Sequence, residues 1–147
     1  MATFNLINDW VENMVEDSDL ASDQFVVALS NTAPGSEGTP PTGDGDGVLA
    51  NVTEITYTFL STRNITTTSS SQAAGLYKLV LEDLVLTATG GSVGPFRYVY
   101  IYDDTVAAPA DPLICYYDYG SSITLLDGET LTIDFDATNG LFQIDEA

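Results

Sequence analysis

The chain has 147 residues, of which 22 are acidic and only three are basic, so its formal net charge is −19. Binding to nucleic acids and to anionic membranes depends on Lys and Arg, so this composition excludes both classes of partner. The chain contains no histidine, which removes the commonest acid–base catalyst and metal ligand. With 44% hydrophobic residues, it has the composition of a globular protein, and its length is that of a single domain, residues 1–147.

The acidic residues are concentrated at the two ends of the sequence. Residues 1–50 contain nine acids and residues 101–147 contain ten, with no base in either segment. Residues 51–100 contain three acids and all three bases, so this middle third is neutral. A neutral surface costs least to desolvate, which makes this third a candidate contact surface. The alternative is that it simply supplies inner strands of the fold.

Residues 3–16 show a helical period, with apolar side chains at steps of three and four and polar side chains on the opposite face. The apolar set is Phe4, Ile7, Trp10, Val11 and Met14. We predict one N-terminal amphipathic helix here. It either caps the open end of a β core or forms an arm that docks on a neighbouring subunit.

Short β-strands are predicted over the rest of the chain, in a β-sandwich of residues 23–145. Residues 24–30 form a continuous apolar strand. Residues 31–47 are dominated by Gly, Pro and Asp, a composition that builds no regular structure, and we expect a long exposed loop there. Residues 61–74 are rich in Ser and Thr and are either an exposed edge strand or a flexible arm.

The remaining strand signals are short apolar runs between turn residues. They lie at 48–55, 57–60, 76–81, 84–88, 96–102, 113–119, 123–125, 129–135 and 141–144. Residues 126–128 (Leu-Asp-Gly) are typical of a hairpin turn. About eight strands with frequent turns predict a mainly β fold, an antiparallel β-sandwich or jelly-roll-like barrel.

Tyrosines alternate along residues 96–102 and recur in the next predicted strand. Val99 and Ile101 lie on the opposite face of the first strand, so both faces are substantial and we expect this strand to be central. The six tyrosines of the two strands are Tyr98, Tyr100, Tyr102, Tyr116, Tyr117 and Tyr119. Tyrosine is favoured in interfaces but is equally at home on a sheet face, and both readings stay open.

Acidic clusters are the only candidates for ligand or reaction chemistry. Two pairs, Asp44 with Asp46 and Asp103 with Asp104, offer carboxylate oxygens to calcium, and the alternative is that both are solvated loops. No other cofactor is expected. Carboxylate pairs that involve Asp118 as well are a candidate for glycoside hydrolysis. Because 22 acids bring such pairs together by chance, we do not expect an enzyme.

Several segments of the chain carry a resemblance. The run GGSVGPFRY at 90–98 is followed by YDDT at 102–105, DPLI at 111–114 and DYGSSITL at 118–125, with SNTAP at 30–34, YKLVL at 77–81 and DFD at 134–136. Together these resemble a widespread group of small virion structural proteins of tailed bacteriophages. The likeness spans most of residues 4–144, and residues 90–125 carry most of its specificity.

The resemblance implies a particle component that is made in the host cytoplasm and built into the virion, with no catalytic residues. We expect a capsid decoration (cement) protein on the outer surface of the head, where an acidic protein is less repelled by packaged DNA. Its expected partners are the major capsid protein and other virion proteins, and it is expected to form a homo-oligomer, with a trimer favoured. The apolar face of residues 3–16, together with Arg63 and Arg97, would form the contacts. The alternative is a tail- or fibre-associated domain that contacts other tail proteins, or host glycans through the tyrosines and residues 31–47.

Overall fold

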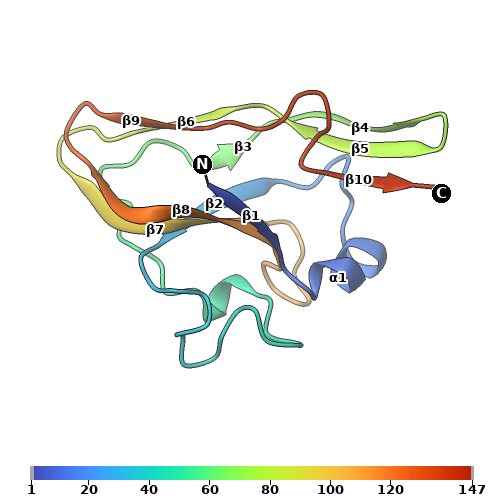
Figure 1. Ribbon diagram of the computed structural model, residues 1–147, viewed down its shortest axis with the longest axis horizontal. Coiled ribbons are helices and arrows are strands. Elements are labelled where there is room, and N and C mark those ends of the chain that lie inside the picture. The colour runs from blue at the N-terminus through green and yellow to red at the C-terminus, as the bar shows by residue number, and fades with distance from the viewer. Residues whose placement is uncertain (1, 147) are drawn as a thin grey trace.

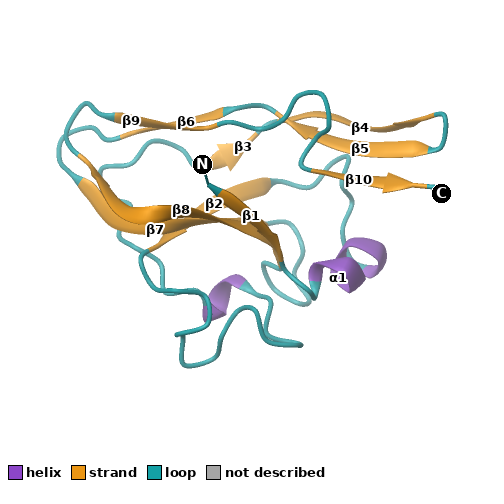
Figure 2. Cartoon of the chain, viewed as in Figure 1, coloured by secondary structure: helices purple, strands orange, loops and turns teal. Residues whose placement is uncertain are grey.

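The computed structural model describes residues 2–146, which form a mainly β, antiparallel protein with one α-helix, as the sequence predicts. The strands are β1 (Thr3–Leu6), β2 (Phe25–Ser30), β3 (Asn64–Ile65), β4 (Thr67–Ala73), β5 (Leu76–Leu81), β6 (Leu84–Thr87), β7 (Val93–Asp103), β8 (Leu113–Leu125), β9 (Thr130–Ile133) and β10 (Phe142–Asp145). Within residues 2–146, helical structure is confined to α1 (Trp10–Glu16) and the short 3-10 helix η1 (Leu49–Asn51), both purple in Figure 2.

Two layers of strands face each other across the core (Figure 1). One layer is a five-stranded sheet in the order β1-β8-β7-β2-β3. The other consists of a three-stranded sheet, β10-β5-β4, continued lengthwise by the pair β6-β9. The barrel form of the expected fold is wrong, because within residues 2–146 the edge strands β1 and β3 pair with no strand of the second layer. Ten strands stand where about eight were expected.

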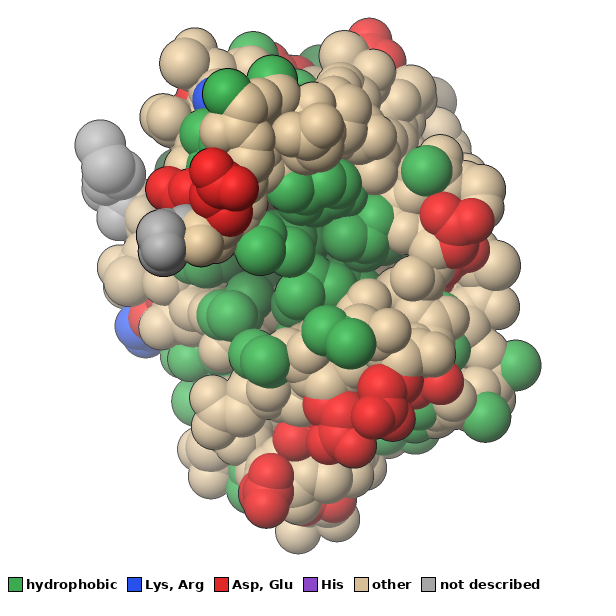
Figure 3. All heavy atoms as spheres, turned by 90° about the vertical axis from the view of Figure 1, so that its right-hand side faces the viewer, with side chains coloured by type: hydrophobic (Ala, Val, Ile, Leu, Met, Phe, Trp, Pro, Cys, Tyr) green, Lys and Arg blue, Asp and Glu red, His purple; other side chains and the backbone are tan. Residues whose placement is uncertain are grey.

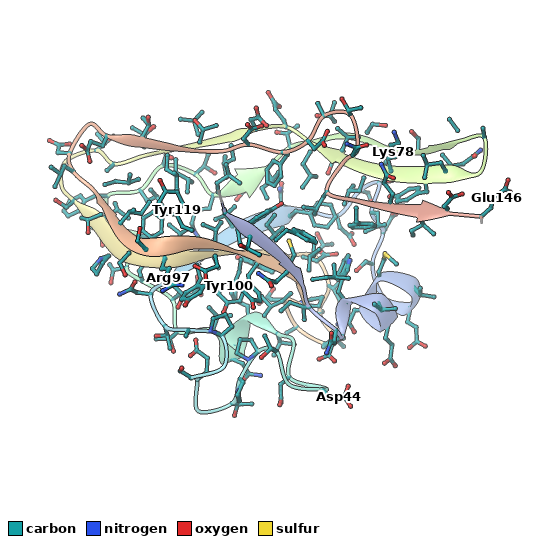
Figure 4. The ribbon with its side chains drawn as sticks, in the orientation of Figure 1. Asp44, Lys78, Arg97, Tyr100, Tyr119 and Glu146 are labelled. Atoms are coloured by element: carbon teal, nitrogen blue, oxygen red, sulfur yellow. The ribbon has the colours of Figure 1, made fainter. Side chains whose placement is uncertain are left out.

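Strand β7 is central, as its two substantial faces predict. It pairs with β2 on one side and with β8 on the other. Val99 shares a pocket with Leu131 and Ile133 of β9, so its face points at the second layer. Tyr100 lies on the opposite face (Figure 4), where the charge of Glu37 in the long loop acts together with burial to raise the pKa of the tyrosine hydroxyl. The five-stranded sheet is therefore covered on both faces.

The helix expected over residues 3–16 forms only over Trp10–Glu16. Thr3–Leu6 is strand β1 instead, and it pairs antiparallel with β8 at the edge of the five-stranded sheet. Phe4 and Leu6 fit a period of two as well as a helical period, so the apolar pattern alone does not decide between them. Pairing with β8 supplies partners for backbone groups that the first turn of a helix would leave unsatisfied.

The long loop expected at residues 31–47 contains no regular element, but only eight of its 17 residues are exposed, and Pro34, Pro41 and Gly47 are buried. It is tied to the N-terminal segment. The carboxylate of Asp9 accepts the backbone N–H groups of Gly45 at 3.0 Å and Gly47 at 2.8 Å. Gly47 is required there because a Cβ at this position would lie 2.8 Å from Cγ2 of Ile7.

Two turns carry the chain between the layers at the left of Figure 1. Residues 88–92 lead from β6 to β7, and residues 126–129 lead from β8 to β9. They are bonded to each other, since the Ala88 N–H donates to the Glu129 carbonyl at 3.0 Å and the Gly128 N–H donates to the Ala88 carbonyl at 2.8 Å. The hairpin prediction is therefore wrong: the turn forms, but β9 pairs with β6 rather than with β8.

Most other predicted strands are confirmed. They are the segments 24–30, 76–81, 84–88, 96–102, 129–135 and 141–144. Residues 113–119 and 123–125 are parts of one strand, β8, and residues 61–74 contain the edge strand β4. Strands at 48–55 and 57–60 were wrongly expected, because these backbone groups pair singly with different partners, for example Ile55 N–H with the Leu29 carbonyl.

Candidate interaction surface

One end of the two layers is open and forms an apolar groove, which we call the end groove. Figure 3 shows it as a hollow floored by hydrophobic side chains. The lining residues are Met14, Val15, Ser18, Asp19, Leu20, Ala21, Ser70, Tyr77 and Ile144, around a volume of about 420 Å³. They come from α1 and the turn after it, from the β4–β5 hairpin and from β10, so the groove lies between the two layers.

The groove exists because α1 is too short to cover this end of the core. The helix docks through Trp10, which is 1% exposed and packs edge to face on Phe142 of β10 with ring centroids 6.4 Å apart. The ring of Tyr77 also contacts Phe142, in a tilted arrangement with ring centroids 6.4 Å apart. Val15, one turn further along, is 77% exposed, and Ile144 opposite is 44% exposed. Apolar side chains on both walls therefore stay accessible to solvent.

The end groove is bordered by acidic residues. Asp19 itself lines the groove; Glu16, Asp17 and Asp145, all exposed, are next to lining residues in sequence, and the exposed Glu146 follows Asp145. Carboxylates appear on both sides of the hollow in Figure 3. No Lys or Arg lines the groove, and Lys78 of β5 turns away from it, with its Nζ donating to the Thr138 carbonyl at 2.9 Å. The charged residues beside the described lining of the groove are therefore acidic.

The predicted helical contact face does not form one surface. Ile7 and Trp10 are each 1% exposed, so they belong to the core and cannot reach a partner. Met14 lines the end groove, and Val11 is exposed on α1. Phe4 lies on β1, where its ring meets that of Tyr117 at 5.5 Å. The accessible apolar surface therefore lies in the end groove and not on the helix face predicted from the sequence.

The two arginines predicted as contact residues both hold internal partners. The guanidinium of Arg97 makes a bidentate pair with Asp118, at 2.7 and 2.8 Å, and this hydrogen bonding lowers the pKa of the Asp118 carboxyl. Arg63 stacks over the ring of Tyr57 at 3.9 Å and lies 3.7 Å from the carboxylate of Glu54. Their role in partner contacts stays a prediction from the sequence, and for Arg97 the pairing with Asp118 argues against it.

The four carboxylates considered for calcium are spread over different environments. Asp44 is exposed at the tip of the long loop (Figure 4), and Asp46 is half-buried nearby. Asp103 is completely buried at the end of β7, whereas Asp104 is exposed. Among residues 2–146 no group of three or more Asp, Glu, Cys or His side chains is placed to hold a metal ion.

Asp103, considered for calcium from the sequence, is a completely buried carboxylate, and the sequence pattern does not indicate that burial. One oxygen accepts the Thr105 N–H at 3.0 Å, while the other has no hydrogen-bond partner. Burial raises the pKa of this carboxyl to about 6, and the charge of the neighbouring Asp23 acts in the same direction. The hydroxyl of Ser18 is also buried nearby, and it favours the ionised form of Asp103. Asp103 therefore lies beside the segment that lines the end groove.

A second apolar pocket, of about 390 Å³, opens along one side of the two layers. Tyr117 and Tyr119 of β8 line it together with Leu131 and Ile133 of β9. Tyr119 is 46% exposed (Figure 4). Of the six tyrosines singled out in the sequence, Tyr98, Tyr100 and Tyr102 are instead buried.

In the comparisons with known proteins, no family model matches the chain, and no curated protein or solved structure is significantly similar to it. Within the described part of the chain, no helix is both long enough and apolar enough to cross a membrane.

Proposed function

We propose that this chain is a structural protein of a tailed-bacteriophage particle and acts as a capsid decoration protein on the outer surface of the head. The end groove carries the proposal. It keeps apolar walls, including Val15 and Ile144, open to solvent on a strongly acidic chain, and contiguous exposed apolar surface is typical of a site where proteins meet. The resemblance of residues 90–125 to phage virion proteins supports the particle as the setting.

The charge supports the outer face of the shell. A net charge of −19 is repelled by packaged DNA, so the interior of a filled head is the less favourable side. The two-layer β arrangement, which we propose to be a β-sandwich, has no disulfide and stands on packing alone, with its single thiol, Cys115, buried. The proposal includes the major capsid protein as partner, a trimeric assembly and no catalytic residue.

Removing residues 1–16 is a poor test, because β1 pairs with β8 and Trp10 is buried in the core. The clean test uses the full chain with Val15→Asn and Ile144→Asn combined, which makes both walls of the groove polar. Val85→Asn is the matched control, since Val85 is 50% exposed on β6 and lies outside the groove.

Binding is measured by co-sedimentation with particles that lack the protein, and the added density is located by electron cryomicroscopy. We expect the wild type and Val85→Asn to add density to the outside of the head, and the double variant to lose most of its binding. Undiminished binding of the double variant, or density confined to the tail, would contradict the proposal.

The pocket formed by Tyr117 and Tyr119 favours a second candidate, a tail- or fibre-associated domain that binds host glycans. The exposed ring of Tyr119 and the half-buried ring of Tyr117, beside apolar and acidic side chains, offer both a flat apolar face and hydrogen-bond acceptors to a sugar. A glycan array with wild type and Tyr119→Ala tests it. Binding that the variant loses would support this candidate, and an array without signal would dispose of it.

A further inference from the structure

We infer that the occupant of the end groove is an apolar segment of a partner protein flanked by Lys or Arg, and not a second copy of this chain. The inference rests on the proposed function only in requiring that the groove binds a protein. It adds the chemistry that the partner must have.

The floor and walls of the groove set the centre of the partner segment. Met14 and Leu20 from the helical side face Tyr77 and Ile144 from the strands, and only Ser18, Asp19 and Ser70 are polar among the lining residues. Burial of these walls is favourable only against apolar side chains, because a polar group seated there would lose its hydrogen bonds to water. The centre of the segment is therefore apolar.

The acidic residues beside the groove determine which charges can flank the apolar centre of the partner segment. Asp19 lines the groove, four further exposed acids lie in the segments that line it, and none of the described lining residues is basic. At physiological ionic strength the screening length is about 8 Å, so charges just outside the groove still act on a bound segment. Acidic flanks would be repelled by these acids and basic flanks attracted to them, which favours correct partners and speeds their association.

A second copy of the chain cannot supply those basic flanks. The chain has three bases. Arg97 is held by Asp118, Arg63 lies between Tyr57 and Glu54, and Lys78 is bonded to the Thr138 carbonyl. Docking one copy into the groove of another would bring acidic surface against acidic surface, so any trimer of this chain must use contacts elsewhere.

Binding of a synthetic peptide to the full-length protein tests the inference. The probe is a fluorescently labelled eight-residue peptide with four central leucines and two lysines at each end. One control peptide replaces the lysines with glutamates, and the other replaces the leucines with serines. Fluorescence anisotropy is measured for the wild type, for Val15→Asn with Ile144→Asn, and for Val85→Asn.

We expect both control peptides to bind the wild type at least about tenfold more weakly than the probe, a difference of about 1.4 kcal/mol. The double variant should lose about as much affinity for the probe, while Val85→Asn keeps it. Any cationic peptide is attracted to so acidic a protein, so the comparison between the two variants is the decisive one.

Equal binding of the probe to the double variant would overturn the inference, and so would equal binding of the glutamate-flanked peptide to the wild type. Concentration-dependent self-association that the double variant abolishes would show that a second copy occupies the groove. Specific peptide binding without binding to particles would leave the inference standing and contradict the decoration role. Groove-dependent binding to particles without peptide binding would contradict the inference and leave the decoration role standing.

Discussion

The two ends of the two-layer structure are finished in different ways. At one end, which we call the closed end, the backbone crosses twice between the layers through residues 88–92 and 126–129. These crossings are bonded to each other, and the Gly90 N–H also donates to the carboxylate of Asp127 at 2.7 Å. The ring of Phe59 lies so close over Gly91 that a Cβ there would be 2.6 Å from it. The core is thus shut off by hydrogen-bonded chain.

At the other end no such double crossing exists within residues 2–146. The seven-residue helix α1 and the turn after it stand beside the ends of β5 and β10 and cover only part of the core. The end groove is the part of this end of the core that α1 and the turn leave uncovered. Asp103, buried with one unpaired oxygen, lies on this side as well. In this fold, apolar surface therefore stays accessible at the end where no chain crossing closes the gap between the two layers.

The closed end should therefore be the more sensitive to loss of core volume. Phe96 of β7 is completely buried and sits opposite Ile123 of β8. We expect Phe96→Ala to lower the free energy of unfolding by about 3–5 kcal/mol, through lost burial and the cavity left behind. Urea denaturation measures this. Met14→Ala, at the half-buried wall of the end groove, is the comparison, and an equal loss there would show that the two ends do not differ.

Asp103 gives the open end a dependence on pH. Its pKa of about 6 in the folded protein lies above the ordinary value of 3.8, so the folded state holds this proton more tightly than the unfolded chain does. Its contribution to stability is therefore fully present below pH 3.8 and is lost as the pH rises through 6.

Asp103→Asn should remove that dependence. The amide oxygen can still accept the Thr105 N–H, and the amide nitrogen places a neutral donor toward Asp23. We expect the variant to be more stable than the wild type by about 1–3 kcal/mol at pH 7, with the difference shrinking toward pH 4. Thermal unfolding across this pH range measures it. Parallel pH profiles for the two proteins would contradict the assignment.

Local signals in the sequence predicted individual strands well and their partners poorly. The apolar run of 24–30 and the two-faced pattern of 96–102 both form strands, as predicted. A strand buried on both faces needs apolar or large side chains at almost every position, and this is visible in the sequence. The turn at 126–128 also formed. Whether the strand after a turn pairs with the strand before it depends on contacts between residues that are distant in sequence. The turn signal therefore predicts the wrong partner for β9, which pairs with β6 and not with β8.

The candidate site was predicted only in part for the same reason. Met14, a contact residue predicted from the helical pattern, does line the end groove. Ile144 also lines it, but the sequence does not predict this, because nothing near Ile144 in sequence indicates that β10 ends beside α1. Trp10 was chosen because a helical period shows an apolar face without showing what covers it. The alternation in Thr3–Leu6 was the signal for β1 that the helical pattern obscured.

A matched pair of substitutions compares the two ends directly. Val93 is 2% exposed at the closed end, and Val15 is 77% exposed at the end groove. Replacement by Thr keeps the shape of the side chain and adds a hydroxyl. We expect Val93→Thr to cost about 1–3 kcal/mol, because the hydroxyl is buried. Val15→Thr should change the free energy of unfolding by less than about 0.5 kcal/mol. Urea midpoints measure both, and a cost at Val15 equal to that at Val93 would mean that the groove is closed in solution.

The smallest effect is expected at Arg97, which pairs across β7 and β8 with Asp118 on the outer face of the sheet. The pair is open to water, so Arg97→Gln should lower stability only slightly, and less still in high salt. Because the arginine lowers the pKa of Asp118, its loss should raise that pKa in an NMR titration, and the stability difference should fade as the pH drops through the folded value. Both donor groups of Arg97 that face Asp118 are occupied, so we expect Arg97→Gln to bind particles as the wild type does, whereas the groove variant does not. Loss of particle binding in Arg97→Gln would extend the contact surface beyond the end groove to the β7–β8 face.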